Sequence, residues 1–160
     1  MDKCNTYFEG IVFSGIGEGG FYVSIYTKKF REKLNIEPYP GTLNIRLRDD
    51  QVELFNECLS NLNLIYIEPP AIPNAKLAAV YAYPIELYLN PHITAFIIKP
   101  AITIYKNDVI EILSPTYLRK ALNLSDGSIL KFKLPPHIIH TQPPLTSFSH
   151  TTNRDTNCRY

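Results

Sequence analysis

The sequence lacks any large excess of charge of one sign. Its 160 residues include 16 Lys and Arg against 15 Asp and Glu, which gives a net charge of +1 with histidine neutral. Acidic and basic residues are mixed along the chain, and this excludes the long basic face that nonspecific nucleic-acid binding requires. Any anion that the protein binds must therefore be held by local geometry.

Cysteine and long apolar runs are also scarce. Cys4, Cys58 and Cys158 are odd in number and far apart, which fits neither a disulfide framework nor a zinc site and favours a reducing cytosol. The first ten residues lack the apolar run of a signal peptide, and the most apolar stretch, near residues 93–98, is too short to cross a bilayer. We expect a soluble, cytoplasmic protein with no membrane partner.

The length suits a single domain with a real core. β-Branched and aromatic residues cluster in short runs between turn residues, which is typical of a mainly β domain. The expected strands are 7–14, 21–27, 42–47, 63–68, 77–89, 93–100, 108–115 and 128–134.

Three short helices are expected between these strands. Phe30 and Leu34 lie one helical turn apart within 28–35, and apolar residues recur at helical spacing over 49–62. In 114–124, Ser114 can cap a helix whose first position is Pro115.

The composition changes after residue 134. The stretch 135–160 is rich in proline, threonine and histidine and has little clustered apolar surface, so we expect a flexible tail after a single domain over 1–134. His137 and His140 have a spacing that can hold a metal, but with no other ligand nearby a solvated tail is the favoured interpretation.

The stretch GIGEGG, residues 15–20, concentrates glycine where the backbone can turn sharply or approach a ligand. Its G-x-G-x-x-G spacing indicates a dinucleotide site only when a helix opens directly after it, and the expected strand at 21–27 argues against that. A Gly-Lys-Ser/Thr phosphate loop is absent. A plain hairpin turn and a glycine-rich loop that covers phosphates both remain open.

A second candidate is EPYPGTLNIRL, residues 37–47. After the Pro40-Gly41 turn, alternation directs Leu43, Ile45 and Leu47 to one face and the intervening Thr42 and Asn44 to the other. Two neutral oxygens suit Mg²⁺, which takes few protein ligands when phosphates supply the rest. An ordinary solvated strand face would show the same alternation.

A third candidate is the start of the expected helix near Ser114. Its first backbone N–H groups lack intrahelical partners and can bind an anion or the polar edge of a base, with Arg119 one turn further on. An ordinary capped surface helix is the alternative.

Taken together, three segments resemble the archaeal CTP-dependent riboflavin kinases: GIVFSGIGEGGFY, PYPGTLNIRL and VIEILSPTYLRKALNLSDGSILKF. The resemblance spans roughly residues 8–134 in the family's order. It implies a small six-stranded β-barrel of the cradle-loop type with short helices. It also implies phosphate transfer from CTP to riboflavin, giving CDP and FMN, with one Mg²⁺ that bridges the nucleotide phosphates.

The resemblance also assigns residues. The nucleotide would be bound by Ile16, Gly17, Glu18, Gly19, Gly20, Phe21, Thr116, Tyr117, Leu118 and Arg119. Mg²⁺ would be held by Thr42 and Asn44, and the flavin by Thr103 and Glu111. No nucleic-acid or membrane partner is implied, and we expect a monomer.

The expected mechanism relies on positioning and charge neutralisation, because phosphoryl transfer asks little covalent chemistry of the protein. Glu111 would either deprotonate the 5′-hydroxyl of riboflavin or only bind a ribityl hydroxyl. Two other functions stay open at this point. A swapped-hairpin DNA-binding regulator would use its Lys and Arg residues, although these are scattered, and a flavin or nucleotide module would bind without turnover.

Overall fold

The computed structural model describes residues 2–17, 19–103 and 105–136. Its helices are α1 (Gly19–Leu34), α2 (Val52–Ser60), preceded by a short 3₁₀ helix over Asp49–Gln51, and α3 (Leu118–Ala121). Its strands are β1 (Phe8–Phe13), β2 (Leu43–Leu47), β3 (Ile65–Ile67), β4 (Val80–Leu87), β5 (Ala95–Pro100), β6 (Val109–Leu113) and β7 (Ile129–Lys133).

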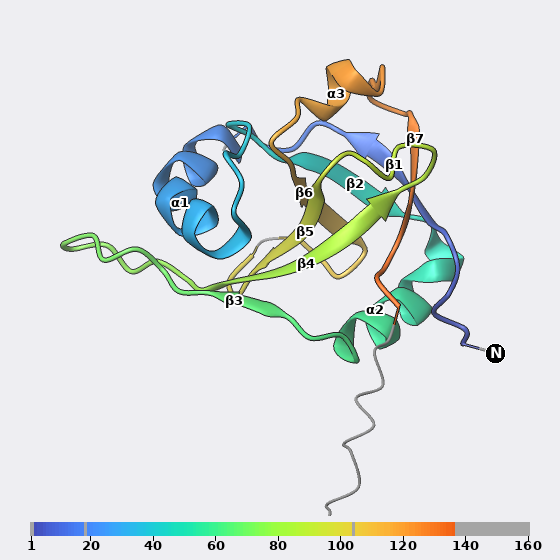
Figure 1. The fold of residues 1–160 in the computed structure, drawn as a ribbon, viewed down its shortest axis with the longest axis horizontal. Coiled ribbons are helices and arrows are strands. Elements are labelled where there is room, and N and C mark those ends of the chain that lie inside the picture. Colours follow the sequence, from blue (N-terminus) through green and yellow to red (C-terminus); the bar gives the residue numbers. More distant parts are fainter. Residues whose placement is uncertain (1, 18, 104, 137–160) are drawn as a thin grey trace, which may run out of the picture.

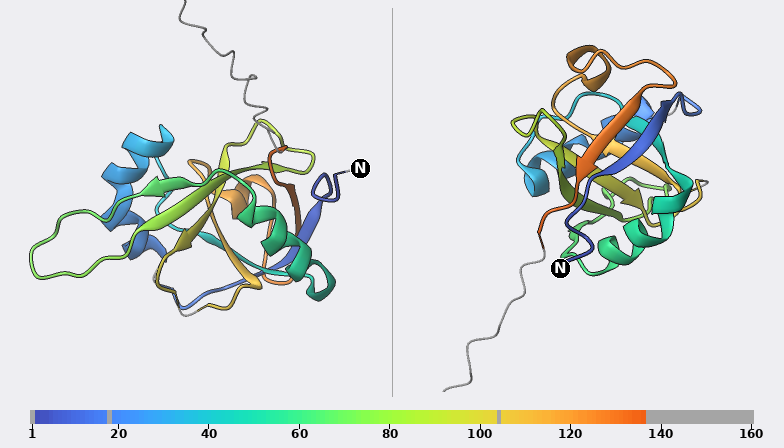
Figure 2. Two further views of the ribbon diagram at one scale, coloured as in Figure 1. Left: turned by 90° about the horizontal axis from the view of Figure 1, so that it is seen from below. Right: turned by 90° about the vertical axis from the view of Figure 1, so that its right-hand side faces the viewer.

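The strands form an antiparallel barrel (Figures 1 and 2). The strand order of the seven-stranded sheet is β3-β4-β5-β6-β2-β1-β7, and a further pairing of β4 with β7 closes the ring. Strand β3 pairs only with the first part of β4 and stays outside the ring. The closed ring therefore consists of the other six strands, which confirms the expected six-stranded barrel.

Helix α1 replaces a strand that the sequence predicted. The expected strand at 21–27 and the short helix at 28–35 are instead one helix of 16 residues, so the strand prediction was wrong. The β-branched and aromatic residues of this segment favoured a strand, but Val23, Tyr26, Phe30 and Leu34 recur at helical spacing and are all buried. Tertiary packing of that stripe overrides the local preference.

Two hydrophobic cores lie on the two sides of the barrel wall. Inside, side chains such as Ile45, Ile97 and Phe132 pack with Phe55 of α2. Outside, the buried face of α1 packs on β3, β4, β5 and β6 through residues such as Ile98 and Leu113. Figure 1 shows α1 and α2 at separate places on the barrel surface. The wall therefore has an outer face that α1 partly covers.

The third expected helix is shorter than the sequence indicated. Helix α3 begins at Leu118, after Tyr117 at the N-cap position, and not at Pro115. The Ser114 hydroxyl donates to the carbonyl of Thr94 (2.6 Å) and accepts from the N–H of Thr116 (3.1 Å). Ser114 thus fixes the loop before α3 instead of capping the helix, and the expected anion-binding helix start at Ser114 is wrong.

Cys4 and Cys58 form a disulfide with their Cα atoms 5.6 Å apart. The expectation that these cysteines do not fit a disulfide framework was wrong for this pair, because positions 54 residues apart in sequence meet where the N-terminal segment passes α2. Cysteine usage therefore does not support the expected cytoplasmic location. No helix in the described ranges is long and apolar enough to span a membrane. His137, His140 and nearly all of the expected tail lie outside the described residues.

The disulfide should contribute to stability. Replacing Cys4 by Ser is expected to lower the free energy of unfolding by about 2–4 kcal/mol, because the closed loop restricts the unfolded chain. Chemical denaturation with and without a thiol reductant measures this. Cys158→Ser is the control, and it should keep the reductant sensitivity of the parent. Equal stability of Cys4→Ser and the oxidised parent would contradict the prediction.

Candidate functional site

A cavity of about 220 Å³ lies between the glycine-rich loop and the outer face of the barrel wall. Its lining includes residues from the loop before α1, from β2 and the turn before it, from the segment after β5, and from β6. The residues among them that the sequence had singled out are Ile16, Gly17, Gly19, Thr42, Asn44, Thr103 and Glu111. Four separate segments therefore meet at one place.

Strand register puts the polar residues on this face. Leu43, Ile45 and Leu47 are buried inside the barrel, as the alternation predicted, so Thr42 and Asn44 face outward. Asn44 pairs across the strands with Glu111 of β6. Glu111 therefore lies beside Asn44 on the outer face of the barrel wall, where it lines the cavity, and not in the barrel interior.

The loop needs glycine because it touches β2 directly. A Cβ atom on Gly15 would lie 2.3 Å from Nδ2 of Asn44, and one on Gly19 would lie 3.0 Å from Oγ1 of Thr42. Gly17 has φ +84°, a conformation that other residues adopt at a cost. Close contact therefore restricts Gly15 and Gly19 to glycine, whereas the backbone conformation does so at Gly17.

The element after the loop is a helix, so the expected hairpin is wrong. Helix α1 opens at Gly19, and its first backbone N–H groups have no intrahelical partners. Gly17 and Gly19 both line the cavity. A glycine-rich loop followed directly by a helix start is the arrangement that binds phosphate in other proteins. The expected strand at 21–27, which argued against a phosphate site at the G-x-G-x-x-G spacing, is therefore replaced by the helix that such a site requires.

Two polar groups of the site are buried at a cost to stability. Oδ1 of Asn44 is buried and has no hydrogen-bond partner among the described residues, a state that costs about 1–3 kcal/mol. Burial raises the pKa of Glu111, and the hydrogen bond donated by Thr42 Oγ1 to Glu111 Oε1 (3.4 Å) partly offsets this.

The donor set fits the expected metal. An unpartnered amide oxygen beside a threonine hydroxyl suits a hard cation whose other ligands are phosphate oxygens and water. No group of three or more His, Cys, Asp or Glu side chains that could hold a metal occurs within the described ranges. Thr42 and Asn44 therefore fit a Mg²⁺ ion whose other ligands are mainly phosphate oxygens of a bound nucleotide.

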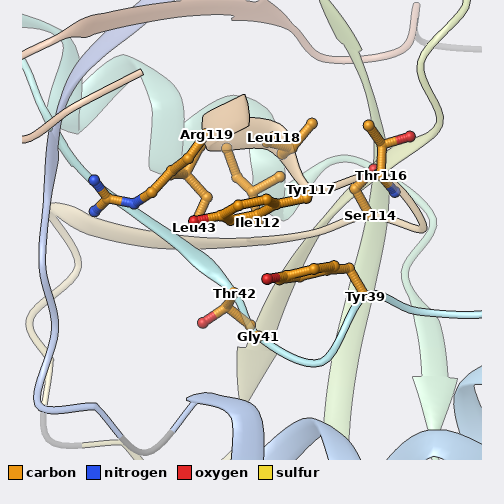
Figure 3. Close-up of a pocket in the computed structure, with 10 residues that line it drawn as sticks. All are labelled: Tyr39, Gly41, Thr42, Leu43, Ile112, Ser114, Thr116, Tyr117, Leu118 and Arg119. Atoms are coloured by element: carbon orange, nitrogen blue, oxygen red, sulfur yellow. The ribbon is translucent and has the colours of Figure 1, made fainter. Parts of the chain in front are cut away.

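A smaller cavity of about 60 Å³ adjoins the first and shares Thr42 with it. Thr116, Tyr117, Leu118 and Arg119 line it, so the predicted second nucleotide segment lies next to the predicted metal pair. The rings of Tyr39 and Tyr117 stack there, with centroids 4.5 Å apart and planes inclined by 10° (Figure 3).

The charge of Arg119 already has a partner. Its Nη2 donates to Oδ1 of Asp126 (2.9 Å) and to the carbonyl of Phe13 (3.4 Å). Ser14 also donates to Asp126, and the hydrogen bonds from Ser14 and Arg119 hold the pKa of that carboxyl below its ordinary value. Arg119 therefore ties the turn before β7 to the end of β1, next to the glycine-rich loop.

Three predicted nucleotide residues are not seen in either cavity wall. Gly20 lies against the carbonyl of Pro40, where a Cβ atom would be 3.1 Å away. Phe21 is 73% exposed, and Glu18 lies outside the described residues.

Four further residues complete the wall of the larger cavity and were not among the predicted site residues. These are Tyr22, Pro100, Ile102 and Tyr105. Tyr22 precedes Tyr26 by one helical turn, so recognising the helical period would have placed it on α1. Pro100 is the last residue of β5, and Ile102 and Tyr105 belong to the irregular segment after it, for which the sequence offered no comparable signal.

Comparison with known proteins identifies the family of this chain. The model of the CTP-dependent riboflavin kinase family, described as "Domain of unknown function DUF120", matches residues 12–134. The chain belongs to this family. A riboflavin kinase of Aeropyrum pernix is 46% identical over 127 residues, which cover 79% of this chain and 94% of that relative.

Other relatives carry the same name. A riboflavin kinase of Sulfurisphaera tokodaii is 38% identical, and the match covers 80% of this chain and 94% of that protein. One from Archaeoglobus fulgidus is 36% identical, and the match covers 83% of this chain but 56% of the relative. The resemblance that the three sequence segments indicated is confirmed, and it extends through the middle of the chain.

The contact between Gly15 and Asn44 can be tested by adding one methyl group. In Gly15→Ala the new Cβ must displace the Asn44 amide or the Tyr105 hydroxyl, which would be 2.7 Å away. We expect at least about a tenfold loss in affinity for a magnesium nucleotide, equivalent to about 1.4 kcal/mol. Isothermal titration calorimetry measures it.

The control for this variant is Gly127→Ala, which strains a positive φ of 92° with nothing near the added Cβ. It should lose stability but bind the nucleotide as the parent does. Equal affinities of the two variants would show that the contact between Gly15 and Asn44 does not shape the site.

The buried carboxyl of Glu111 should lower the free energy of unfolding when it is ionised. Because the folded pKa of Glu111 is raised, the protonated carboxyl favours the folded state at low pH. This contribution to the free energy of unfolding is lost as the pH rises through the folded pKa and the buried carboxyl ionises. Glu111→Gln should therefore have a higher melting temperature than the parent at about pH 8, and this difference in melting temperature should shrink toward about pH 4. Thermal unfolding of the two proteins without nucleotide or metal, at both pH values, measures the difference.

Glu53→Gln, at an exposed position of α2, is the matched control and should show no such pH-dependent gain. A Glu111→Gln protein that melts below the parent at every pH would mean that the ionised carboxylate stabilises the fold.

Proposed function

We propose that this protein is a riboflavin kinase that transfers the terminal phosphate of CTP to the 5′-hydroxyl of riboflavin and releases FMN and CDP. Membership of the family and the names of its relatives support the reaction class. The observation that carries the proposal is the cavity itself, where an unpartnered Asn44 oxygen, the buried Glu111 carboxyl and the glycine-rich loop meet.

The nucleotide would extend across both cavities. Thr42 lines each of them, so one molecule can contact the 116–119 segment and the glycine-rich loop at the same time. The polar backbone and side chains of 116–119 would bind the base, and the N–H groups at the start of α1 would bind phosphate oxygens. The flavin would then lie toward Thr103 and Glu111.

Thr42 and Asn44 would hold Mg²⁺, which would neutralise part of the charge of the nucleotide phosphates. Among the described residues that line the larger cavity there is no lysine or arginine. Compensation of the phosphate charge would therefore come from the metal, from backbone N–H groups and from neutral hydroxyl and amide donors.

The reaction forms one bond and breaks one. The 5′-hydroxyl oxygen of riboflavin bonds to the terminal phosphorus of CTP. The bond from that phosphorus to the bridging oxygen breaks, and the bridging oxygen leaves on CDP with the bonding electron pair. Glu111 would accept the hydroxyl proton, and burial, which raises the pKa of its carboxyl, makes it a stronger base than an exposed carboxylate. The monomeric state and the cytoplasmic location remain predictions.

A direct assay tests the function. Purified protein with riboflavin, Mg²⁺ and either CTP or ATP should form FMN with CTP, as measured by chromatography with fluorescence detection. FMN with ATP alone would overturn the donor assignment. Nucleotide binding without FMN would favour a binding module, and salt-sensitive duplex DNA binding without FMN would favour a DNA-binding regulator.

The metal assignment has its own test. Asn44→Ala should lower FMN formation at least about tenfold and shift the Mg²⁺ dependence to higher concentrations, because one metal ligand is lost. Asn61→Ala, at the C-terminal end of α2 and outside the lining of both cavities, is the control and should keep the parent Mg²⁺ curve. An unchanged Mg²⁺ curve for Asn44→Ala would remove Asn44 from the metal site.

A further inference from the structure

The larger cavity contains a second buried polar atom without a partner. Among the described residues, only Oη of Tyr22 and Oδ1 of Asn44 are buried side-chain oxygens or nitrogens with no hydrogen bond. Both residues line the same cavity. Buried polar atoms nearly always have partners, so two exceptions on one cavity indicate a missing ligand. The proposed metal accounts for Asn44 but not for Tyr22.

The ring of Tyr22 is held from behind. It stacks on Tyr26 at a centroid distance of 4.7 Å, and Tyr26 donates its hydroxyl to the carbonyl of Ala78 (2.5 Å). Tyr22 lies in the first turn of α1, directly after the glycine-rich loop. The position of its hydroxyl is therefore fixed by the same helix that presents Gly19 to the cavity.

The Tyr22 hydroxyl is a neutral donor. Burial, and next the neighbouring Tyr26 and Glu111, raise the pKa of Tyr22 well above its ordinary value, so the phenol keeps its proton. Glu111 and Tyr22 line the same cavity. A protonated phenol beside a carboxylate and a metal pair can serve an acceptor atom of a ligand.

We propose that Tyr22 donates a hydrogen bond to the phosphoryl group that is transferred. This inference rests on the proposed kinase function. Phosphate oxygens only accept hydrogen bonds, and the described lining of this cavity offers them no cationic side chain. Tyr22 lines the same cavity as the loop expected to bind phosphates and as Glu111, which would take the hydroxyl proton, so its hydroxyl can serve a phosphoryl group held there. A fixed donor there stabilises charge that develops during transfer.

Tyr22→Phe tests this inference because it removes one hydroxyl and keeps the ring. We expect kcat/KM for CTP to fall about tenfold or more, a transition-state loss of about 1.4 kcal/mol. Affinity for CDP, which lacks the transferred group, should stay within about twofold, and so should the riboflavin affinity measured by fluorescence quenching.

The matched control is Tyr26→Phe, which removes a buried hydroxyl that is already bonded and does not line the cavity. It should keep the parent kcat/KM but melt at a lower temperature, whereas Tyr22→Phe should melt at or above the parent temperature because it removes an unpartnered group. Opposite effects on activity and stability in the two variants are the expected result.

Three results would overturn the inference: an unchanged kcat/KM for Tyr22→Phe, a loss of riboflavin affinity in its place, or an equal loss of CDP and CTP affinity. If the parent protein forms no FMN, the proposed function fails. The comparison of CTP with CDP binding then still decides whether Tyr22 contacts the terminal phosphate.

Discussion

The register of β2 between its two neighbours is the constraint on which the site depends. Phe13 of β1, Asn44 of β2 and Glu111 of β6 lie in one row across the sheet. A slip of β2 by a single residue would turn its side chains to the opposite faces, so apolar residues would face the cavity and Asn44 would be buried among Ile45's present neighbours. The energy of packing the barrel core therefore also holds the polar residues in place.

The barrel wall separates stability from chemistry. Its inner face and α2 form one apolar core, and its outer face forms a second core with α1. The site occupies the outer face where α1 begins, so the helix that buries Val23, Tyr26 and Phe30 also brings the glycine-rich loop against β2. The same helix packing that stabilises the second core thus sets the width of the cavity.

The site retains polar groups that the fold alone does not satisfy. Oδ1 of Asn44 and Oη of Tyr22 lack partners within the described part of the chain, and Glu111 is a carboxyl whose burial disfavours its charge. Each of these costs stability in the absence of ligand. Their concentration at one cavity is what distinguishes a functional site from a solvated strand face, which the alternation of β2 alone did not decide.

Much of the fold and part of the site followed from the sequence. The alternation of Leu43, Ile45 and Leu47 determined which way Thr42 and Asn44 face, because side chains of a strand alternate between its two sides. Local patterns failed where distant segments decide the outcome: α1 is a helix because Tyr26 and Phe30 pack on the barrel, and Cys4 meets Cys58 because the N-terminal segment crosses α2. Only the tertiary structure brought Tyr22 and Glu111 to one cavity, since their shared position depends on helix and sheet packing across about ninety residues of chain, which no local pattern encodes.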